Sequence, residues 1–403
     1  MIAIPTPSYV TVDPAPRLVF GPGAVAEVGP IVRDLGVRRA LLVTDPGVAA
    51  AGVAARVEAA CAAAGVAVTV FDRVAPSPTL ADVEAGVAAA RRALDGGELA
   101  VVAVGGGSPM DAAKAIALGA VNPVPVRRLD DPAAVERPGL PIVAVPTTAG
   151  TGAETNGFGV VTDTEAVRKV YLGDESTVPV AAVLDPELTL GVPPPVTAAT
   201  GMDALTHALE SLASRRANDV AAGDALRAVE LVSAHLATAV ADGRDLAARS
   251  QLLLAAHLAG RAMRSTGLGL AHAIGHALTN RAGIPHGAAL AMVLPAVLRF
   301  NLPVRAEAFG AAAGAFRFRS AGPTAPGDRT GGPASAEAAA HRLVDEVAAL
   351  SAAVGTDRPL RAAGVGPGLV PVLAADAVAD VVIANNPRPA TEDEVAAVVT
   401  AAL

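Results

Sequence analysis

The sequence of 403 residues has little of several residue types that mark particular classes of protein. Its single cysteine, Cys61, excludes an intramolecular disulfide framework, and the alanine-rich surroundings of this residue predict a buried, unreactive thiol. Tryptophan is absent and only 2% of the residues are aromatic. Lysine and arginine total 31 against 39 aspartates and glutamates, a net charge of −8. This balance, without a basic patch, argues against nucleic acid as a partner.

Signals for export or membrane insertion are also lacking. Residues 1–16 contain several prolines and no basic segment followed by a long apolar core, so they do not resemble a secretory signal. Elsewhere Gly, Pro or charged residues interrupt the apolar runs before about 18 residues, the length typical of a membrane span. We therefore expect a soluble, cytoplasmic protein with no membrane partner.

Short apolar runs alternate with alanine-rich stretches over the first half of the chain. Unbroken apolar strands that alternate with helices predict a parallel sheet covered on both faces. The pattern predicts a strand, turn and helix within 17–31, strands at 39–44, 66–71, 99–104 and 141–145, and helices up to about residue 64 and at 81–94.

Strand signals end near Pro193, and long helical runs follow. Helices are predicted at 197–214, 220–241, 245–265, 268–281, 288–300 and 335–354. Residues 320–334 are rich in Gly and Pro and predict a flexible loop. The predicted fold class is therefore α/β, with a Rossmann-like parallel-sheet domain at 1–190 followed by an all-helical domain at 191–403.

A run of three glycines, Gly105, Gly106 and Gly107, follows a predicted buried strand and precedes a helix. Backbone amides at such a turn, together with the helix N-terminus, favour an anion. Ser108 is predicted as the N-cap, with Pro109 in the first helical position and Asp111 completing a capping box. Because three glycines exceed what a tight turn needs, we favour a pyrophosphate site, although the pattern is not the G-x-G-x-x-G fingerprint.

Two further segments could serve a dinucleotide. Asp45 follows an earlier strand and either accepts hydrogen bonds from an adenosine ribose, which favours NAD over NADP, or simply begins a turn. A Gly/Thr-rich loop at 146–155 includes Thr147, Thr148 and Thr151, whose hydroxyls and amides suit a phosphate or a ribose.

Five candidate metal donors gather in the helical half. Asp203 and His207 lie four residues apart, as do His272 and His276, and each pair would share one face of a helix. His286 follows shortly after, between a proline and a glycine. An aspartate with several imidazoles suits Fe(II), Zn(II) or Ni(II) rather than Mg or Ca. The alternative is that these are ordinary core or surface histidines.

Taken together, these motifs resemble the iron-containing (group III) alcohol dehydrogenases, within the dehydroquinate synthase-like fold. The resemblance covers nearly the whole chain. The matching segments are Phe20–Gly23, Val43–Asp45, Gly105–Lys114, Val145–Glu154, Asp185–Leu188, Gly201–Glu210, Gly267–His276, Pro285–Gly287 and Asn385–Pro389.

The resemblance implies roles for particular residues. It places the metal ligands at Asp203, His207, His272 and His286, and His276 near the nicotinamide as a proton relay or an orienting group. The implied cofactor contacts are Asp45, Gly105, Gly106, Gly107, Ser108, Thr147, Thr148 and Lys169. The implied cofactors are NAD(H) and one divalent metal, which is Fe(II) or else Zn(II). The implied substrate is a small alcohol or aldehyde, and the implied assembly is a homodimer or higher homo-oligomer.

Three other activities of the same fold are alternatives. A maleylacetate reductase is not expected to retain both Asp203 and His207, and a glycerol dehydrogenase-like enzyme would not need His207. A dehydroquinate synthase-like lyase should carry several Lys or Arg near the histidines for a phosphate-bearing substrate, and few are there. The sequence therefore favours hydride transfer between an alcohol and nicotinamide, with the metal polarising the substrate oxygen.

Overall fold

The computed structural model describes residues 16–94, 97–318 and 333–403. The flexible loop predicted at 320–334 falls outside the described residues, apart from its last two positions, which begin a helix. The described chain forms two compact units, one ending at Val192 and the other beginning at Pro193. This division lies two residues after the domain boundary predicted from the sequence.

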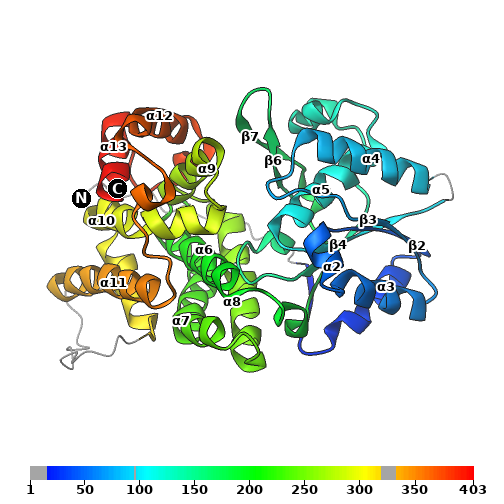
Figure 1. Ribbon diagram of the computed structural model, residues 1–403, viewed down its shortest axis with the longest axis horizontal. Helices are drawn as coiled ribbons and strands as arrows, with labels where there is room; N and C mark the ends of the chain where they lie inside the picture. The colour runs from blue at the N-terminus through cyan, green and yellow to red at the C-terminus, as the bar shows by residue number, and fades with distance from the viewer. Residues whose placement is uncertain (1–15, 95–96, 319–332) are drawn as a thin grey trace. The chain divides into compact units, whose positions relative to one another are not determined.

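The unit before Pro193 is built on a parallel sheet that has six strands over the described residues, as predicted (Figure 1). The order across the sheet is β1-β8-β5-β4-β2-β3. The strands are β1 (Arg17–Phe20), β2 (Arg39–Val43), β3 (Ala67–Phe71), β4 (Ala100–Gly105), β5 (Ile142–Pro146) and β8 (Ala181–Leu184). In the central pair Gly105 is in register with Pro146, so the two loops that follow these strands leave the same edge side by side.

Helices cover both faces of this sheet because successive strand residues point to opposite sides. On β2, Leu41 and Val43 join the core under α4 and α5, whereas Ala40 and Leu42 join the core under α1 and α3. Figure 1 shows α4 and α3 on opposite sides of the strands. The helices are α1 (Val28–Asp34), α2 (Pro46–Ala50), α3 (Val53–Ala63), α4 (Leu80–Leu94) and α5 (Gly107–Val121).

The thiol of Cys61 lies fully buried on α3. Burial raises its pKa to about 11, so it stays protonated near neutral pH. The predicted burial of this thiol is thereby confirmed.

An antiparallel hairpin of β6 (Gly159–Asp163) and β7 (Arg168–Leu172) was not predicted. Its strands are short and only alternate residues of β6 are buried, which leaves a weak apolar signal. The hairpin packs on the N-terminal half of α5, where Gly159 approaches the backbone of Asp111 so closely that a Cβ would lie 2.2 Å from its carbonyl oxygen.

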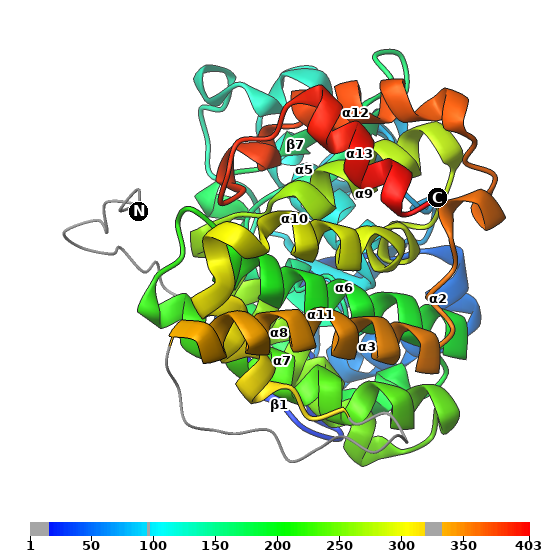
Figure 2. The same cartoon turned by 90° about the vertical axis from the view of Figure 1, so that its left-hand side faces the viewer.

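The second unit is helical over residues 193–318 and 333–403, as predicted. Its helices are α6 (Pro194–Ala213), α7 (Asp219–Ala241), α8 (Leu246–Thr266), α9 (Leu270–Ala282), α10 (His286–Ala315), α11 (Pro333–Ala353), α12 (Val370–Ala379) and α13 (Glu392–Ala401). In Figure 2, α11 and α10 cross the front of this unit and α6 lies behind them. The sequence analysis did not predict α12 or α13 and ended α10 near residue 300, whereas the structure continues this helix past Pro303 and a kink at the non-helical Arg305.

Helix α6 is the core helix of this unit, with every residue from Gly201 to Ala213 buried. It packs against α7, α8 and α10. Its last carbonyls, those of Ala213 and Ser214, accept hydrogen bonds from the Arg305 guanidinium at 2.7 and 2.8 Å. Because such carbonyls have no partner within their own helix, Arg305 stabilises this end of α6.

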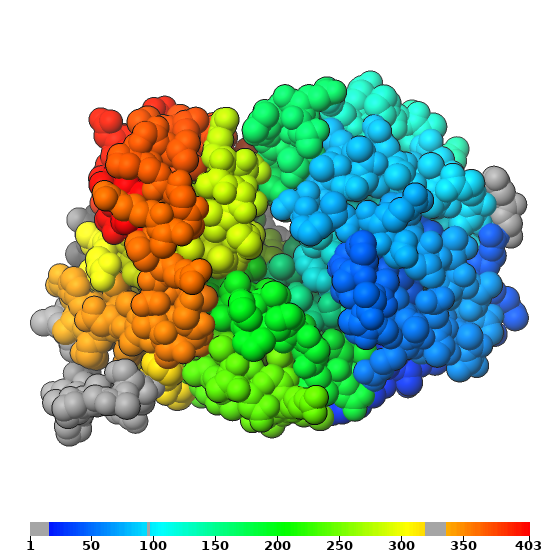
Figure 3. All heavy atoms as spheres, in the orientation of Figure 1, coloured from blue at the N-terminus to red at the C-terminus, as the bar shows by residue number. Residues whose placement is uncertain are grey.

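Helix α9 lies between α10 and α12 and shares a core with both and with α13. The space-filling view shows the yellow-green surface of α9 adjoining the orange surface of α12 (Figure 3).

One helix among the described residues, α10, is long and apolar enough to cross a membrane by length and composition alone. Half of its most apolar window is buried within the unit, a pattern that core helices also show. Despite its two internal prolines, α10 thus contains one apolar window as long as a membrane span, which the sequence analysis did not expect.

We predict opposite effects for two glycine substitutions in α10. A Cβ at Gly287 would lie 2.5 Å from the backbone oxygen of Ala199 on α6, whereas Gly314 has no neighbour within 4 Å of the same position. Gly287→Ala should cost about 1–3 kcal/mol through overpacking, whereas Gly314→Ala should gain up to about 1 kcal/mol in helix propensity. Thermal unfolding of both variants measures this. Equal midpoints would contradict the close approach of α6 and α10.

Candidate functional site

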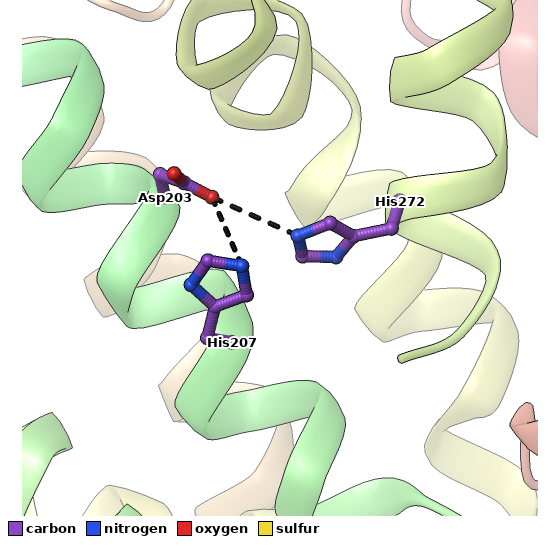
Figure 4. Close-up of side chains that lie close together, drawn as sticks. All are labelled: Asp203, His207 and His272. Atoms are coloured by element: carbon purple, nitrogen blue, oxygen red, sulfur yellow. Dashed lines mark ion pairs between the residues drawn. The ribbon is translucent and has the colours of Figure 1, made fainter. Parts of the chain in front are cut away.

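Three of the predicted metal ligands meet between α6 and α9. The candidate ligand atoms of Asp203, His207 and His272 all lie within 4.8 Å of one another. Figure 4 shows the carboxylate of Asp203 directed at both imidazoles. Its Oδ1 is 3.4 Å from Nε2 of His207 and 3.7 Å from Nε2 of His272. The four-residue spacing on α6 thus brings two donors to one face, and α9 brings the third.

The unsatisfied atoms of this group fit a bound cation. Asp203 Oδ1 and His272 Nε2 are both buried, and neither has a hydrogen-bond partner among the described residues. A buried polar atom left unpaired costs about 1–3 kcal/mol. A divalent cation between the two atoms would satisfy both, and a carboxylate with imidazoles is a donor set for Fe(II) or Zn(II).

The remaining two histidines lie beside this group. His286, the first residue of α10, has its ring centre 5.4 Å from that of His272. His276 stacks on His286 with ring centres 5.2 Å apart. In the described part of the chain the tight group of ligand atoms consists of Asp203, His207 and His272, with His286 adjacent to it.

The charges in the group favour an ionised Asp203 and a neutral His286, the states in which these two residues can bind a metal. Burial opposes the ionisation of Asp203, but the neighbouring imidazoles, His207 foremost, lower its pKa overall. Burial lowers the pKa of His286 far below its usual value, which keeps that ring neutral. Burial also acts to lower the pKa of His272, but the carboxylates of Glu210 and Asp203 outweigh it and raise that pKa to about 9. His272 is therefore in a strongly negative environment that a cation would neutralise.

The triple glycine and the Thr loop, predicted separately, lie against each other. Gly105 has φ +146°, a conformation that L side chains rarely adopt. A Cβ at Gly106 would lie 3.1 Å from Thr148 Oγ1, and one at Gly107 would lie 2.9 Å from the methyl group of Thr151. The amide of Thr147 donates to the carbonyl oxygen of Gly105 at 2.9 Å. Backbone amides and hydroxyls thus gather at one edge of the sheet, beside the start of α5.

The predicted cap of α5 is wrong. The helix begins at Gly107, with Gly106 as its N-cap and no side-chain cap. Pro109 falls in the third position, where its missing N–H still costs no helical hydrogen bond. The Ser108 hydroxyl instead accepts from the amide of Ser77 at 3.2 Å. The side chain of Asp111 pairs with Lys114 at 3.8 Å rather than closing a capping box.

Asp45 begins α2 as its N-cap, with Oδ1 accepting from the amide of Val48 at 2.9 Å. Its other oxygen faces Gly105, 3.4 Å from the position that a Cβ would take there. Asp45 is thus a helix cap that also adjoins the triple glycine, so its two sequence interpretations are compatible.

Lys169 lies on β7 and donates to the hydroxyl of Thr162 at 2.9 Å. Burial lowers its pKa, against the attraction of Asp111. Burial also raises the pKa of Asp111 to about 6, opposed by Lys114, and lowers that of Lys114 to about 8. Lys114 is buried and the other two groups are partly buried, and together they form a charged cluster along the N-terminal half of α5.

Comparisons with known proteins cover almost the entire chain. The family model described as iron-containing alcohol dehydrogenase matches residues 15–186, and the C-terminal model of the same family matches residues 197–403. The chain belongs to the iron-containing alcohol dehydrogenase family. The predicted family and fold are thereby confirmed, and the chain is an alcohol dehydrogenase or aldehyde reductase.

Several relatives of this alcohol dehydrogenase match it from end to end. The probable alcohol dehydrogenase EutG of Salmonella typhimurium is 38% identical, over 94% of this chain and 91% of the relative. The NAD-dependent methanol dehydrogenase of Bacillus methanolicus is 35% identical, over 96% and 98%. A crystal structure of 1,3-propanediol oxidoreductase is 35% identical and superposes with a TM-score of 0.89, covering 98% of this chain and 100% of the other.

The sequence analysis missed two carboxylates that contact histidines of this alcohol dehydrogenase. Glu210 Oε2 lies 2.6 Å from Nδ1 of His272, and Asp380 Oδ2 lies 2.8 Å from Nδ1 of His276. A signal existed for Glu210, which follows His207 by three residues and so shares its side of α6. Asp380 lies 104 residues beyond His276, and no spacing in the sequence links them.

We predict that removal of metal lowers the stability of this alcohol dehydrogenase. With free metal at about 100 times its Kd, binding adds about 2.7 kcal/mol, or roughly 5–10 °C in Tm for a unit of about 200 residues. Scanning calorimetry before and after chelation measures this shift.

Asp203→Ala is the matched control, because it removes the carboxylate that links the two imidazoles. This variant, and His272→Ala as well, should hold little metal and show no shift on chelation. A shift in either variant as large as that of the unmodified chain would contradict the ligand assignment.

Proposed function

We propose that this enzyme transfers hydride between a small primary alcohol or aldehyde and NAD(H), with one divalent metal held by Asp203, His207, His272 and His286. The observation that carries this proposal is the buried, unsatisfied Asp203 Oδ1 facing two imidazole nitrogens. A metal-independent reductase would have no use for that arrangement.

The metal would be Fe(II), in keeping with the family, and Zn(II) can compete for the same donors because its affinity for such ligands is higher. When bound, it supplies a Lewis acid that polarises the oxygen of the substrate. The chain contributes an ionised Asp203 and imidazoles held in place by burial in α6 and α9. Burial of the donors also keeps competing water away from them.

The cofactor site that we propose lies in the other unit, at Gly105, Gly106 and Gly107 together with Thr148 and Thr151. The close packing of the glycines on the Thr side chains leaves backbone amides at the start of α5 for a pyrophosphate. Ser108, Asp111, Thr147 and Lys169 surround this point, and the proposal includes them as cofactor contacts. A relative that is named as NAD-dependent supports NAD(H) as the dinucleotide.

His276 is the residue that we propose for proton transfer. Its Nδ1 contacts the Asp380 carboxylate, which can only accept a hydrogen bond when ionised and so holds the proton on that nitrogen. The other ring nitrogen is then free of a proton and can receive one from the substrate hydroxyl or through water. Imidazole suits this task because one ring nitrogen can accept a proton while the other keeps its hydrogen bond.

For His276→Ala we expect retained metal but a loss of kcat on the order of 10²-fold, the contribution typical of a general acid–base group. His341→Ala, which removes an exposed histidine on α11, is the control and should keep both metal and rate. The measurements are metal content and steady-state oxidation of a primary alcohol. Loss of metal would make His276 a ligand, and an unchanged rate would make it structural.

For cofactor choice we expect a preference for NAD(H) that depends on the charge of Asp45. Asp45→Gly should lower the ratio of kcat/KM for NAD over NADP on the order of tenfold, equivalent to about 1.4 kcal/mol. Asp45→Asn is the matched variant that separates the two roles of Asp45, because asparagine keeps the N-cap of α2 while removing the charge. It should lose the preference and keep the stability. An unmodified enzyme that prefers NADP would contradict this role.

A further inference from the structure

We propose that Glu210 is the positioning residue of the metal centre, holding His272 in the tautomer and orientation that present Nε2 to the cation. The inference rests on the metal site of the proposed function. It assigns a role to a buried glutamate that is not itself a ligand.

Hydrogen bonding at His272 fixes where its proton lies. Glu210 Oε2 is 2.6 Å from Nδ1 of His272, and both side chains are buried. An ionised carboxylate can only accept, so Nδ1 carries a proton, and Nε2 is the ring nitrogen left to present its lone pair to a metal. Nε2 is the nitrogen that has no partner among the described residues and that lies 3.7 Å from Asp203 Oδ1. The outer partner of His272 thus prepares the inner nitrogen to bind a metal.

Two backbone amides hold the Glu210 carboxylate in place. Its carboxylate accepts from the amide of Gly269 at 2.9 Å and from that of Ala271 at 2.7 Å. All three hydrogen bonds require an acceptor at this point, which the ionised carboxylate supplies.

The same amides lie at the N-terminus of α9, whose N-cap Gly269 provides no side-chain acceptor. Glu210 comes from α6, seven residues after Asp203, and so supplies the missing cap from the helix that carries two of the ligands. One carboxylate therefore joins α9 to α6 and sets the ring of the third ligand relative to the first two.

A second buried cap of α9 allows these two effects to be separated. Asn386 Oδ1 accepts from the amide of Leu270 at 3.3 Å and from the Asn301 side chain at 2.9 Å. It anchors the same turn of α9, and its contacts run to that amide, to Asn301 and to Arg388. Asn386→Ala should therefore loosen the start of α9 without changing the tautomer of His272.

The test compares Glu210→Gln with Asn386→Ala in the full-length chain. A glutamine presents one acceptor and one donor group to three donors, so its amide N–H₂ must face either His272 or the α9 amides. Facing His272, it would move the ring proton to Nε2. We expect the Kd for Zn(II), measured by competition with a chelator, to rise 10- to 100-fold in Glu210→Gln. In Asn386→Ala the Kd for Zn(II) should stay within about threefold of that of the unmodified chain. The two variants should nevertheless lose a similar amount of Tm when both are measured without metal.

Two outcomes would overturn the inference: an unchanged Kd in Glu210→Gln, or an equal rise of Kd in Asn386→Ala. If Glu210→Gln does not fold, Glu210→Asp replaces it. That variant keeps the charge but shortens its reach by one methylene, so Kd should still rise more than in Asn386→Ala, and an equal or smaller rise would overturn the inference. If the proposed metal site itself were wrong, Asp203→Ala would bind Zn(II) as tightly as the unmodified chain. This result distinguishes failure of the proposed function from failure of the inference about Glu210.

Discussion

The arrangement of the helical unit depends on one buried carboxylate, that of Asp203, facing two imidazoles without a hydrogen bond on Oδ1. In water that oxygen would be solvated, so its place inside the protein is unfavourable unless another group satisfies it. The surrounding histidines lower its pKa and keep it charged despite burial. A negative oxygen and an imidazole Nε2 that face the same buried space form a cation site, which ties the fold of this unit to its chemistry.

The packing of α6 follows from this constraint. A helix that carries ligands on one face must still bury its other faces, and α6 does so with Met202, Leu205 and Leu209 against its helical neighbours. Arg305 closes its C-terminal end, and Glu210 joins it to α9. The ligand positions are therefore set by a rigid core element, which suits a site that must hold its geometry to a fraction of an ångström.

The sequence predicted what depends on local periodicity and little of what depends on long-range contact. Four-residue spacing was enough to pair Asp203 with His207, and unbroken apolar runs were enough for a parallel sheet. The hydrogen bonds that Glu210 accepts from α9 and the contact between Asp380 and His276 join segments about 60 and 100 residues apart, so no pattern along the chain predicts them. The cap of α5 was mispredicted because Ser108 has the right chemistry for an N-cap, whereas the preceding glycines allow the helix to begin two residues earlier.

The most direct test of this account is the position of the metal in crystals of the iron-loaded enzyme, located by anomalous scattering at the iron edge. The account predicts one peak per chain, with a carboxylate oxygen of Asp203 and nitrogens of His207, His272 and His286 about 2.0–2.2 Å away, as in other first-row metal sites. It also predicts that the Glu210 carboxylate remains on Nδ1 of His272. A peak elsewhere in the chain, or one at this place without Asp203 or His272 among its ligands, would contradict it.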